Sequence, residues 1–487
     1  MFVGIDLGTS GVKVVLVDAD QRVVAQATAS LSIQRHRPLW SEQDPAAWWM
    51  AVDAAMGWLR GRAPQQVGAV RGLGLTGQMH GATLLDSEDR VLRPAILWND
   101  GRSAEQCHEL ERQAPSSRHI TGTIAMPGFT APKLMWVARH EPEVFRNVAR
   151  VLLPKDYLRL LITGDYATDL SDAAGTLWLD VANRQWSERM LAVTELDESQ
   201  MPALHEGTRP TGVIRRQVAE AWGLPADVVV AAGAGDNCGG AVGAGVIQDG
   251  QGQITLGTSG VYFVATAEYA PHADAGIHTF CHCIPERWQQ TAVILSAASC
   301  LRWVTEVTGA ASEAALLAEA ERALGRDSSI LFLPYLSGER TPHNDPNAKG
   351  VFFGMTHATG RGDLVRAVLE GVAFAFADGQ QALAAAGTNL AEVSVIGGGA
   401  RSEVWGRILA SVLDLPLVYR KDATVGPAFG AARLARLATT GEDPSQVCSS
   451  PPAQRVVHPE PELRERYAVL HLRYRKLYHQ LKSSFFG

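Results

Sequence analysis

Two short apolar runs separated by a small polar turn open the chain. Residues 2–17 read FVGIDLGTSGVKVVLV. Short β-rich runs on either side of a Gly-containing turn predict a β-hairpin. The turn, Gly8–Ser10, can aim several backbone N–H groups at one anion such as a phosphate group. Asp6 ends the first run, and a lone carboxylate beside a phosphate cradle indicates a bound Mg²⁺.

This pattern recurs about half the chain later. The letters LGTSGV occupy residues 7–12 and again 256–261, and each copy lies between two apolar runs. An internal repeat at this spacing predicts two similar halves, each with a phosphate-binding hairpin. In the second copy Thr255 stands where the first has Asp6, so only the first half supplies a metal-facing carboxylate. An ordinary hairpin turn is the alternative, and two copies disfavour it.

After a third predicted strand in residues 22–33, an amphipathic pattern begins. Asp44 followed by Pro45 is a favourable helix start, and Gly61 is the expected end. Four apolar residues share one face of this helix and are expected to pack against the sheet: Trp48, Val52, Met56 and Leu59.

Three glycines at 72, 74 and 77 have the GxGxxG spacing of a dinucleotide site. That fingerprint needs a helix directly afterwards. Residues 77–86 read GQMHGATLLD and predict a turn into another strand, so we reject the dinucleotide interpretation. Met79 and His80 then follow a strand end, where ligands of open α/β sheets bind. A structural role for His80 is equally compatible with the local sequence.

Two polar segments in the first half have open interpretations. The turn of Trp98, Asn99, Asp100 and Arg102 suits a sugar, since it offers a ring face and hydrogen-bonding groups, and it equally suits a helix cap. Asp169 and Asp172 lie in a polar loop to which the sequence assigns no role. The region from there to about Gly223 is expected to be an insertion on the α/β core.

A second strand-end carboxylate follows this region. The apolar strand 228–232 breaks at Gly233 and leads to Asp236 and Asn237 before a Gly- and Ala-rich helix. Asp is a preferred helix N-cap. A carboxylate that faces a phosphate cradle can also accept a hydroxyl proton as a general base. Both roles fit the position, and they compete for the same oxygens.

The second half carries three further features. His278, Cys281, His282 and Cys283 lie on one strand, where adjacent residues face opposite sides, so buried thiols are favoured over a zinc site. The long loop 334–350 could be a lid or a subunit contact. A triplet of glycines at 397–399 follows an apolar strand and lets a flat ring or a phosphate approach the backbone. The helix predicted after Pro459 is expected to cover a surface.

Composition narrows the function classes. The 487 residues carry a formal net charge of −7 and no long basic run, which argues against nucleic acid or a membrane surface as partner. No apolar run of about 18 residues is present, so no membrane span is expected. Six cysteines in so long a chain do not indicate a disulfide framework, which favours a reducing cytoplasm. The N-terminus opens directly into a predicted strand, so no signal peptide is expected.

These features together indicate phosphoryl transfer. Three glycine-rich turns each follow a strand, and two carboxylates stand at strand ends. The chain contains no GxxxxGK[ST] sequence and is therefore not a P-loop enzyme. The remaining design holds a nucleotide between two half-sites that close and exclude water, with catalysis by positioning and charge neutralisation.

The same motifs resemble the FGGY carbohydrate kinases of the actin–hexokinase superfamily. The resemblance rests on GIDLGTS, GDN at 235–237, the second LGTS, GGGA at 397–400, and the signatures Gly128–Trp136 and Gly350–Glu370. It covers essentially the whole chain. It implies an α/β fold of two ribonuclease-H-like domains, 1–245 and 246–487, around a nucleotide cleft. A homodimer is plausible from the family alone.

Within the family, segments such as LWSEQDP, RPAILWNDGR and FLPYLSGERTPHND resemble members that phosphorylate D-xylulose. The resemblance implies ATP-dependent transfer to the 5-hydroxyl, with Asp236 as base and Asp6 as the Mg²⁺ and phosphate residue. It further implies a sugar site at Met79, His80, Asp236 and Asn237. The implied ATP contacts are Gly8, Thr9, Ser10, Gly257, Thr258, Ser259, Gly398, Gly399 and Ala400.

Two alternatives remain at this point. One is a family kinase for another ketose or polyol, such as ribulose or 1-deoxy-D-xylulose; glycerol is disfavoured, because its kinases carry charged residues where Met79 and His80 stand. The other is an ATP-binding sugar sensor without turnover. A sensor has no need of a base at Asp236.

Overall fold

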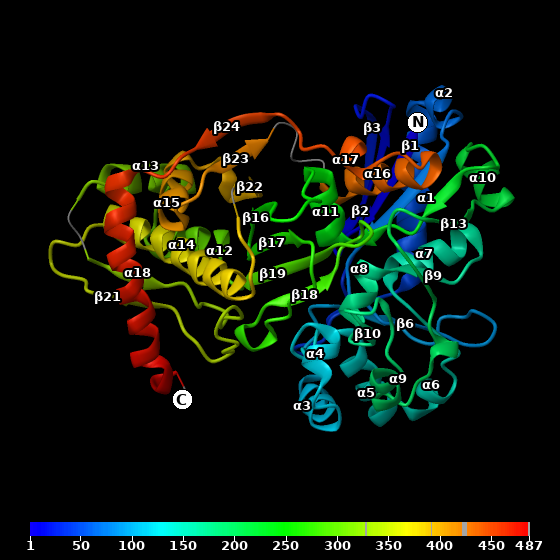
Figure 1. The fold of residues 1–487 in the computed structure, drawn as a ribbon, viewed down its shortest axis with the longest axis horizontal. Helices are drawn as coiled ribbons and strands as arrows, with labels where there is room; N and C mark the ends of the chain where they lie inside the picture. The colour runs from blue at the N-terminus through cyan, green and yellow to red at the C-terminus, as the bar shows by residue number, and fades with distance from the viewer. Residues whose placement is uncertain (327–328, 391, 421–425, 486–487) are drawn as a thin grey trace.

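The computed structural model describes residues 1–326, 329–390, 392–420 and 426–485. These residues form two bodies side by side, each built around a seven-stranded sheet (Figure 1). The N-terminal half, blue to green, lies on the right of that view, and most of the C-terminal half lies on the left. Among the helices of these described ranges, none has both the length and the hydropathy to cross a membrane.

The first sheet is a hairpin extended by parallel strands. Strands β1, β2 and β3 are antiparallel, while β5 pairs parallel with β1, and β14 and β15 pair parallel with β5. This sheet contains β1 (Phe2–Leu7), β2 (Gly11–Val17), β3 (Val23–Ser30), β5 (Gly72–Gly77), β13 (Pro210–Val213), β14 (Val229–Ala231) and β15 (Ala234–Gly235).

The second sheet repeats this arrangement. Strands β16, β17 and β19 are antiparallel, while β22 pairs parallel with β16 and β23 with β22. The strand order β19-β17-β16-β22-β23 thus matches β3-β2-β1-β5-β14, which confirms the two similar halves and the ribonuclease-H-like α/β class. This sheet contains β16 (Gly252–Leu256), β17 (Gly260–Thr266), β18 (His278–Cys281), β19 (Trp288–Ile294), β22 (Val393–Ile396), β23 (Leu417–Arg420) and β24 (Ala453–Val457).

Helix α1 (Pro45–Arg62) covers one face of the first sheet as predicted. The Asp44 side chain accepts a 2.9 Å hydrogen bond from the backbone N–H of Ala46, so it is the N-cap. The four apolar residues expected on its inner face are fully buried. The predicted end at Gly61 is wrong by one residue, because the last turn continues to Arg62 before the next helix begins with a proline.

The insertion between β5 and β13 forms a small body below the first sheet, cyan to green in Figure 1. Its apolar cluster also takes in Phe280 and Cys281 of β18. The expected insertion is confirmed, but it ends before β13 rather than near Gly223, because β13 pairs with β14 in the first sheet. Its helices are α3 (Ala104–Gln113), α4 (Ser117–Thr121), α5 (Thr130–His140), α6 (Pro142–Arg146), α7 (Pro154–Thr163), α8 (Leu170–Ala173) with the 3₁₀ turn η1 (Ala174–Thr176), and α9 (Glu188–Val193). Its short strands pair as β6 (Thr83–Leu85) with β8 (Arg150–Leu152), β9 (Ala167–Asp169) with β12 (Ala203–His205), and β10 (Leu179–Asp180) with β11 (Gln185–Trp186).

Helices of the second half pack on the second sheet. The buried helix predicted in this half is α14 (Arg361–Ala385), and the C-terminal helix α18 (Pro461–Leu481) packs against it and against α15 (Glu403–Leu413). The expected surface-covering role of α18 is confirmed. The other elements here are α12 (Ala298–Val307), α13 (Glu313–Ala323), and the pair β20 (Leu331–Leu333) and β21 (Val351–Phe353), which flanks the loop 334–350.

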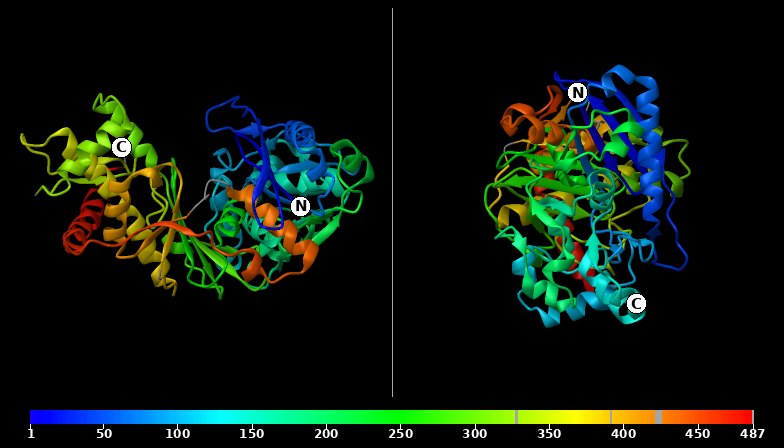
Figure 2. Two further views of the ribbon diagram at one scale, coloured as in Figure 1. Left: turned by 90° about the horizontal axis from the view of Figure 1, so that it is seen from above. Right: turned by 90° about the vertical axis from the view of Figure 1, so that its right-hand side faces the viewer.

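One helix of the second half returns to the first sheet. Helix α16 (Gly426–Thr440) packs on β1, β5 and α11 (Asp236–Ala244), and Figures 1 and 2 show it in orange beside the blue strands. A Cβ added at Gly4 would lie 1.9 Å from the Ala428 carbonyl oxygen, and one at Gly74 would lie 2.0 Å from that of Ala431. The glycines therefore allow close helix–sheet packing.

Rejection of the dinucleotide motif is confirmed, because β5 leads through a turn into β6.

Candidate active site

Asp6 lies at the carboxyl end of β1, beside Thr76 of β5. The two residues are paired in the parallel register, and the Thr76 hydroxyl donates a 3.0 Å hydrogen bond to the Asp6 carboxylate. Burial raises the pKa of Asp6 to about 6, while the Thr76 hydrogen bond and the positive charge of Lys13 oppose that rise. The carboxylate is thus held in a fixed orientation at the strand end.

Asp236 reaches the same edge from a different strand. Strand β15 runs parallel to β5 with Ala234 opposite Thr76, so Asp236, the first residue of α11, follows directly beyond that edge. The helix N-cap is Gly235, so the N-cap role considered for Asp236 is wrong. Burial, and after it the negative charge of Asp6, raises the pKa of Asp236 to about 7. The backbone N–H of Asn237 donates to its carboxylate at 2.7 Å, and no other hydrogen-bond partner is found among the described residues.

The donor chemistry of this edge fits a divalent cation. Both carboxyl groups have raised pKa values, and the negative charge of Asp6 contributes to the rise at Asp236, so added positive charge would stabilise the ionised form of each. Hard cations such as Mg²⁺ take one or two carboxylates and fill their other positions with water and phosphate oxygens. Asp6 and its neighbourhood meet that requirement.

The turn that contains Gly8, Thr9 and Ser10 leaves two amides unused. The Gly8 N–H donates to the Gly11 carbonyl at 3.0 Å, which closes the turn. The Thr9 carbonyl accepts from the Gln43 side chain at 2.8 Å, and the Thr9 hydroxyl accepts from Trp98 Nε1 at 2.9 Å. Within the described ranges, the N–H groups of Thr9 and Ser10 have no acceptor. Hydrogen bonds from Gln43 and Trp98 therefore hold the turn in place, while its two amides remain available to an anion.

The turn of Gly257, Thr258 and Ser259 repeats this geometry. The Gly257 N–H donates to the Ser259 carbonyl at 3.1 Å. The start of α12 holds the turn, since the carbonyl oxygens of Gly257 and Thr258 accept backbone N–H groups of residues 297–299. No acceptor is found, among residues whose placement is described, for the N–H groups of Thr258 and Ser259. The sequence repeat thus produces the same unused pair of amides twice.

The glycine triplet packs against the second turn. Gly397 has a φ of +98°, and a Cβ there would lie 2.6 Å from the Leu256 carbonyl oxygen. Gly399 would meet the Leu256 side chain at 2.6 Å. Gly398, by contrast, is exposed, and a Cβ there would meet only the tip of Arg401, at 3.9 Å. The strand register places Thr255 opposite Ile396. The backbone at Gly398, which continues to the half-buried Ala400, therefore adjoins the turn of Gly257, Thr258 and Ser259.

His80 has a defined tautomer. Its Nδ1 lies 2.8 Å from the Gly175 carbonyl oxygen, so Nδ1 carries the proton and donates. Burial, with a contribution from the charge of Lys133, lowers the pKa of His80 to about 3, so the ring is neutral. Its Nε2 is consequently a hydrogen-bond acceptor. Met79 beside it is buried and packs on Gly235, whereas Asn237 is exposed.

The sequence did not indicate three residues near His80 as site residues: Phe129, His278 and Arg340. The Phe129 ring lies between His80 and His278, with ring centroids 4.6 and 5.7 Å away. Arg340, from the loop 334–350, lies 3.5 Å from His278 and lowers the pKa values of both histidines. Its Nε is buried and has no hydrogen-bond partner within the part of the chain that the structure describes. The long polar loop was the only sequence signal for it.

Other sequence candidates have structural partners. Asp100 and Arg102 form a buried ion pair of 2.6 Å, and Arg102 also pairs with Glu42 and lies over the Trp40 ring, so these two side chains are not free to bind a sugar, whereas Trp98 is exposed. The four His and Cys residues of the 278–283 strand are buried, as expected.

Ligand atoms of His282, Cys283 and Cys238 lie within 4.8 Å of one another. Both ring nitrogens of His282 nevertheless contact backbone groups: Nδ1 accepts from the Ile284 N–H at 3.0 Å, and Nε2 lies 3.2 Å from the Val246 carbonyl oxygen. No lone pair is left there for a metal.

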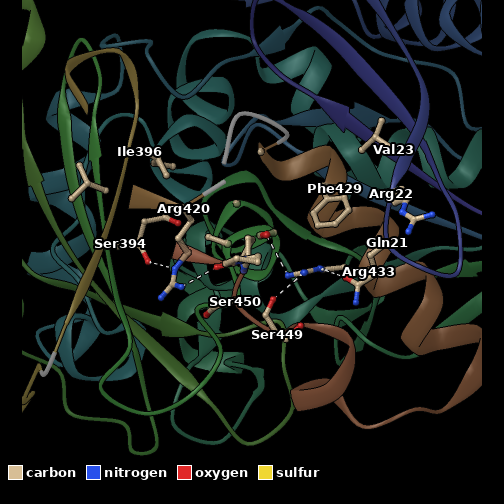
Figure 3. A pocket seen from close by; sticks show the side chains of 18 of the residues that line it. Gln21, Arg22, Val23, Ser394, Ile396, Arg420, Phe429, Arg433, Ser449 and Ser450 are labelled. Carbon is tan, nitrogen blue, oxygen red and sulfur yellow. Dashed lines mark hydrogen bonds between the residues drawn. The ribbon is translucent and has the colours of Figure 1, made fainter. Parts of the chain in front are cut away.

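A cavity of about 600 Å³ lies between the halves, beside α11 and α16, and its described lining does not include Asp6, Asp236 or the turns 8–10 and 257–259 (Figure 3). Its two central guanidinium groups are already used. Arg420 donates to Ser394 and to the Pro451 carbonyl oxygen, and Arg433 donates to Gln21 and to backbone carbonyl groups. We therefore do not place the reacting groups in this cavity.

Comparison with known proteins identifies close relatives. The model of the FGGY family of carbohydrate kinases, N-terminal domain, matches residues 1–243, and the corresponding C-terminal domain matches residues 252–439. The chain is 52% identical over 482 residues to a xylulose kinase of Escherichia coli strain K12, with 99% of each chain covered.

Solved structures agree. A crystal structure titled as a xyloylose kinase from Brucella ovis superimposes with a TM-score of 0.97 at 48% identity, covering 99% of both chains. The xylulose kinase of Rhodospirillum rubrum superimposes with a TM-score of 0.93 at 29% identity over the full length of both chains.

Proposed function

Since the chain belongs to the FGGY family of carbohydrate kinases, we propose that it transfers the γ-phosphoryl group of ATP to the 5-hydroxyl of D-xylulose, giving D-xylulose 5-phosphate and ADP. The xylulose kinases that it resembles at 52% and 48% identity over nearly their full length support this substrate. The observation that carries the chemistry is the pairing of Asp6 and Asp236 at one sheet edge, between two turns with unused amides.

Asp236 is the proposed general base. It takes the proton of the 5-hydroxyl as that oxygen forms a bond to the γ-phosphorus, and the bond from the γ-phosphorus to the bridging oxygen breaks as ADP leaves. A carboxyl group with a pKa of about 7 is half ionised at neutral pH and accepts a proton more readily than an ordinary aspartate. Asp6, which accepts the Thr76 hydrogen bond, is the more acidic member of the pair and suits a charge-binding role.

Family kinases act on ATP with a divalent metal, and Asp6 is the residue we assign to Mg²⁺. When bound, the ion would neutralise charge on the phosphates during transfer. The amides of Thr9, Ser10, Thr258 and Ser259 are the proposed phosphate donors, and the backbone of Gly398, Gly399 and Ala400 is the proposed surface for adenosine. Their support is the unused hydrogen-bonding capacity and the open backbone described above.

The sugar site is proposed at Met79, His80 and Asn237, next to Asp236. A neutral His80 offers Nε2 as acceptor to a sugar hydroxyl. We add Arg340 to this site, because its partnerless Nε and its influence on His80 direct a donor toward the same place. A ketose presents hydroxyl groups that can donate to His80 Nε2, and carbonyl and hydroxyl oxygens that can accept from Arg340.

Assembly and compartment complete the proposal. We treat residues 1–245 and 246–487 as the two units that close around the nucleotide, with a homodimer as the assembly suggested by the family. All six cysteines are free and buried, which suits a reducing cytoplasm.

The test is ADP release from ATP and Mg²⁺ with D-xylulose, D-ribulose, L-ribulose, glycerol or no sugar, followed by ³¹P NMR of the product. We expect D-xylulose to give the highest kcat/KM and a phosphate coupled to the C5 protons. A higher value with another ketose would retain the fold and mechanism but contradict the substrate. Equal ADP release with and without sugar would contradict kinase activity altogether.

A further inference from the structure

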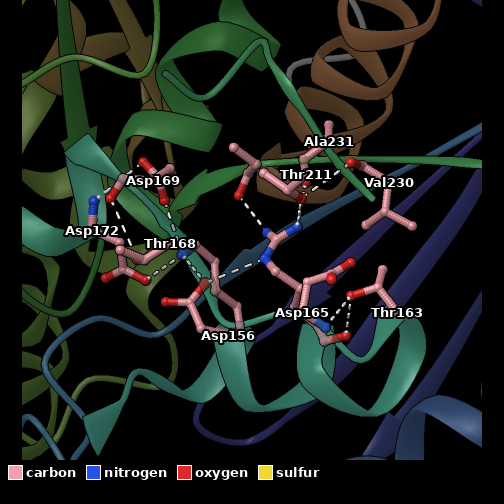
Figure 4. A network of polar contacts seen from close by, with 12 residues as sticks. Asp156, Thr163, Asp165, Thr168, Asp169, Asp172, Thr211, Val230 and Ala231 are labelled. Carbon is pink, nitrogen blue, oxygen red and sulfur yellow. Dashed lines mark hydrogen bonds and ion pairs between the residues drawn. The ribbon is translucent and has the colours of Figure 1, made fainter. Parts of the chain in front are cut away.

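A fully buried cluster of charged side chains lies under the strand ends, in the insertion (Figure 4). The Lys155 ammonium group lies 2.8 Å from Asp156, 2.9 Å from Asp169 and 3.1 Å from Asp172. Arg159 lies 3.7 Å from Asp156. None of these side chains is exposed to solvent, and the proposed chemistry uses none of them.

The cluster is balanced in charge but costly to bury. Burial, with the negative charges of Asp169 and Asp156, raises the pKa of Asp172 well above its usual value against the opposing effect of Lys155. With Asp172 protonated, two cations face two carboxylates. Apolar residues of similar volume often stabilise a protein as well as such a buried network does. The geometry of its outward contacts therefore matters more than its contribution to stability.

One outward contact reaches the strand that carries Asp236. The Asp169 carboxylate accepts from the backbone N–H of Ser171 at 2.8 Å and from the Ser171 hydroxyl at 2.5 Å. The same hydroxyl oxygen accepts the N–H of Gly235 at 3.2 Å. Gly235 is the residue before Asp236. A chain of contacts thus runs from Lys155 through Asp169 and Ser171 to the backbone that holds the proposed base.

A second contact fixes the bend just before this point. Arg159 donates to the carbonyl oxygens of Ala231 and Ala232, where β14 ends. The chain then turns at Gly233, which has a φ of +84° and approaches Leu75 so closely that a Cβ would lie 2.1 Å from the Leu75 carbonyl oxygen. The path from β14 into β15 is therefore tied to the cluster at both ends.

The third contact reaches the proposed sugar site. The segment that begins at Asp169 continues through α8 to Gly175, whose carbonyl accepts the Nδ1–H of His80. A Cβ at Gly175 would lie 2.5 Å from two atoms of the His80 ring. One short segment thus contacts both the backbone of the base and the ring that faces the sugar.

We infer that Lys155, Asp169 and Ser171 form a positioning chain, which holds the Asp236 carboxylate and the His80 ring in mutual register through the segment 169–175. This inference rests on the proposed function of those two residues. It gives a role to Asp169, for which the sequence alone indicated none. The polar loop predicted there is wrong, because Asp169 ends β9 and caps α8, which contains the buried Asp172. This positioning chain acts through Gly235 and His80 and contacts no reacting atom.

The test compares Ser171→Ala with Ser411→Ala. Both serines are buried, and each hydroxyl accepts one backbone N–H; that of Ser411, on α15 in the other half, accepts from Glu460 at 3.0 Å. Steady-state kinetics with xylulose and ATP are measured well below the Tm of each variant. Hydrogen–deuterium exchange is followed in a peptide that spans residues 230–240.

We expect Ser171→Ala to lower kcat by about tenfold to hundredfold, since misplacement of about 1 Å has this size of effect, with the KM for ATP within about twofold. Exchange in the 230–240 peptide should rise. Ser411→Ala should keep kcat within about twofold and leave that peptide unchanged, although its Tm also falls because a buried N–H loses its acceptor. Equal loss of kcat in both variants, an unchanged kcat in Ser171→Ala, or unchanged exchange in its 230–240 peptide would overturn the inference.

A failure of the proposed function can be told apart from a failure of the positioning chain. The wild-type rate with xylulose tests the proposed function, whereas the exchange of the 230–240 peptide tests the tether even in a protein without turnover. If the 230–240 peptide exchanges faster in Ser171→Ala alone, the positioning chain is the restraint on the strand that leads to Asp236. The ratio of variant to wild-type kcat then shows whether this restraint serves catalysis.

Discussion

The carboxylate of Asp6 lies near enough to Asp236 to raise the pKa of the second carboxyl group. The two residues come from β1 and from the start of α11, and both flank the end of β5. Asp6 accepts a side-chain hydrogen bond and lies under the influence of Lys13, whereas among the described residues Asp236 accepts only from the backbone N–H of Asn237. Two carboxyl groups with different environments can take different roles, one binding charge and the other accepting a proton.

The pKa of Asp236 predicts a pH dependence. A raised pKa means that the carboxyl group is mostly protonated below pH 7 and cannot serve as base there. We expect kcat/KM for xylulose to rise about tenfold from pH 6 to pH 8 and then level off, as a base with a pKa of about 7 becomes ionised. His80, with a pKa of about 3, stays neutral over this range, whereas Asp6, with a pKa of about 6, also becomes fully ionised above pH 6 and adds about a further twofold. A flat profile between pH 6 and 8 would contradict the assignment of the base.

Removal of the base tests its role directly. Asp236→Asn keeps the size of the side chain but removes its capacity to accept the 5-hydroxyl proton, so kcat should fall by about 10²–10⁴-fold. Binding of xylulose, measured by calorimetry, should persist. Asp227→Asn is the matched control, because Asp227 is an exposed aspartate just before β14. If Asp236→Asn retained more than a tenth of the wild-type kcat, another group would have to be the base.

Arg340 should determine affinity for the sugar. Arg340→Met keeps most of the side-chain length but removes the donors, so we expect the KM for xylulose to rise by about tenfold, which corresponds to the loss of one hydrogen bond from a charged group. The KM for ATP should stay within about twofold. Arg302→Met, at an exposed arginine on α12, is the control and should change neither KM. Equal KM values for xylulose in wild type and Arg340→Met would remove Arg340 from the site.

The packing of α16 on the first sheet predicts a large stability effect. In Gly74→Ala the new methyl group would lie 2.0 Å from the Ala431 carbonyl oxygen, and since both are attached to backbone, the helix must shift. We expect a loss of about 3 kcal/mol or more in the free energy of unfolding. Gly57→Ala, on the exposed side of α1 with no atom within 4 Å, should stabilise by about 0.5–1 kcal/mol. Thermal unfolding of both variants decides; similar Tm values would contradict this packing.

Local patterns predicted the elements of this fold well. The two LGTSGV turns gave hairpins in matching positions of the two sheets, because turn chemistry and strand alternation act over a few neighbouring residues. The cap at Asp44 and the apolar face of α1 follow from the same kind of local rule.

Contacts between distant segments explain what local patterns missed. The glycines at 72 and 74 suggested a nucleotide motif that had to be rejected, and their actual use, to admit α16, depends on a helix more than 350 residues later in the chain. Similarly, Asp100 and Arg102 suited a sugar in sequence, but in the fold they pair with each other, and Arg102 also contacts Glu42 and Trp40.

The sequence by itself determined the doubled hairpin, the two strand-end carboxylates and the family resemblance, since each is written in residues close together in the chain. Only the tertiary structure decided that Asp6 and Asp236 meet, that His80 is neutral with Nε2 as acceptor, and that Arg340 and the Lys155 cluster adjoin them. The reason is physical: pKa values, tautomers and unpaired donors depend on burial and on neighbours from other strands, which appear only when the sheets have formed.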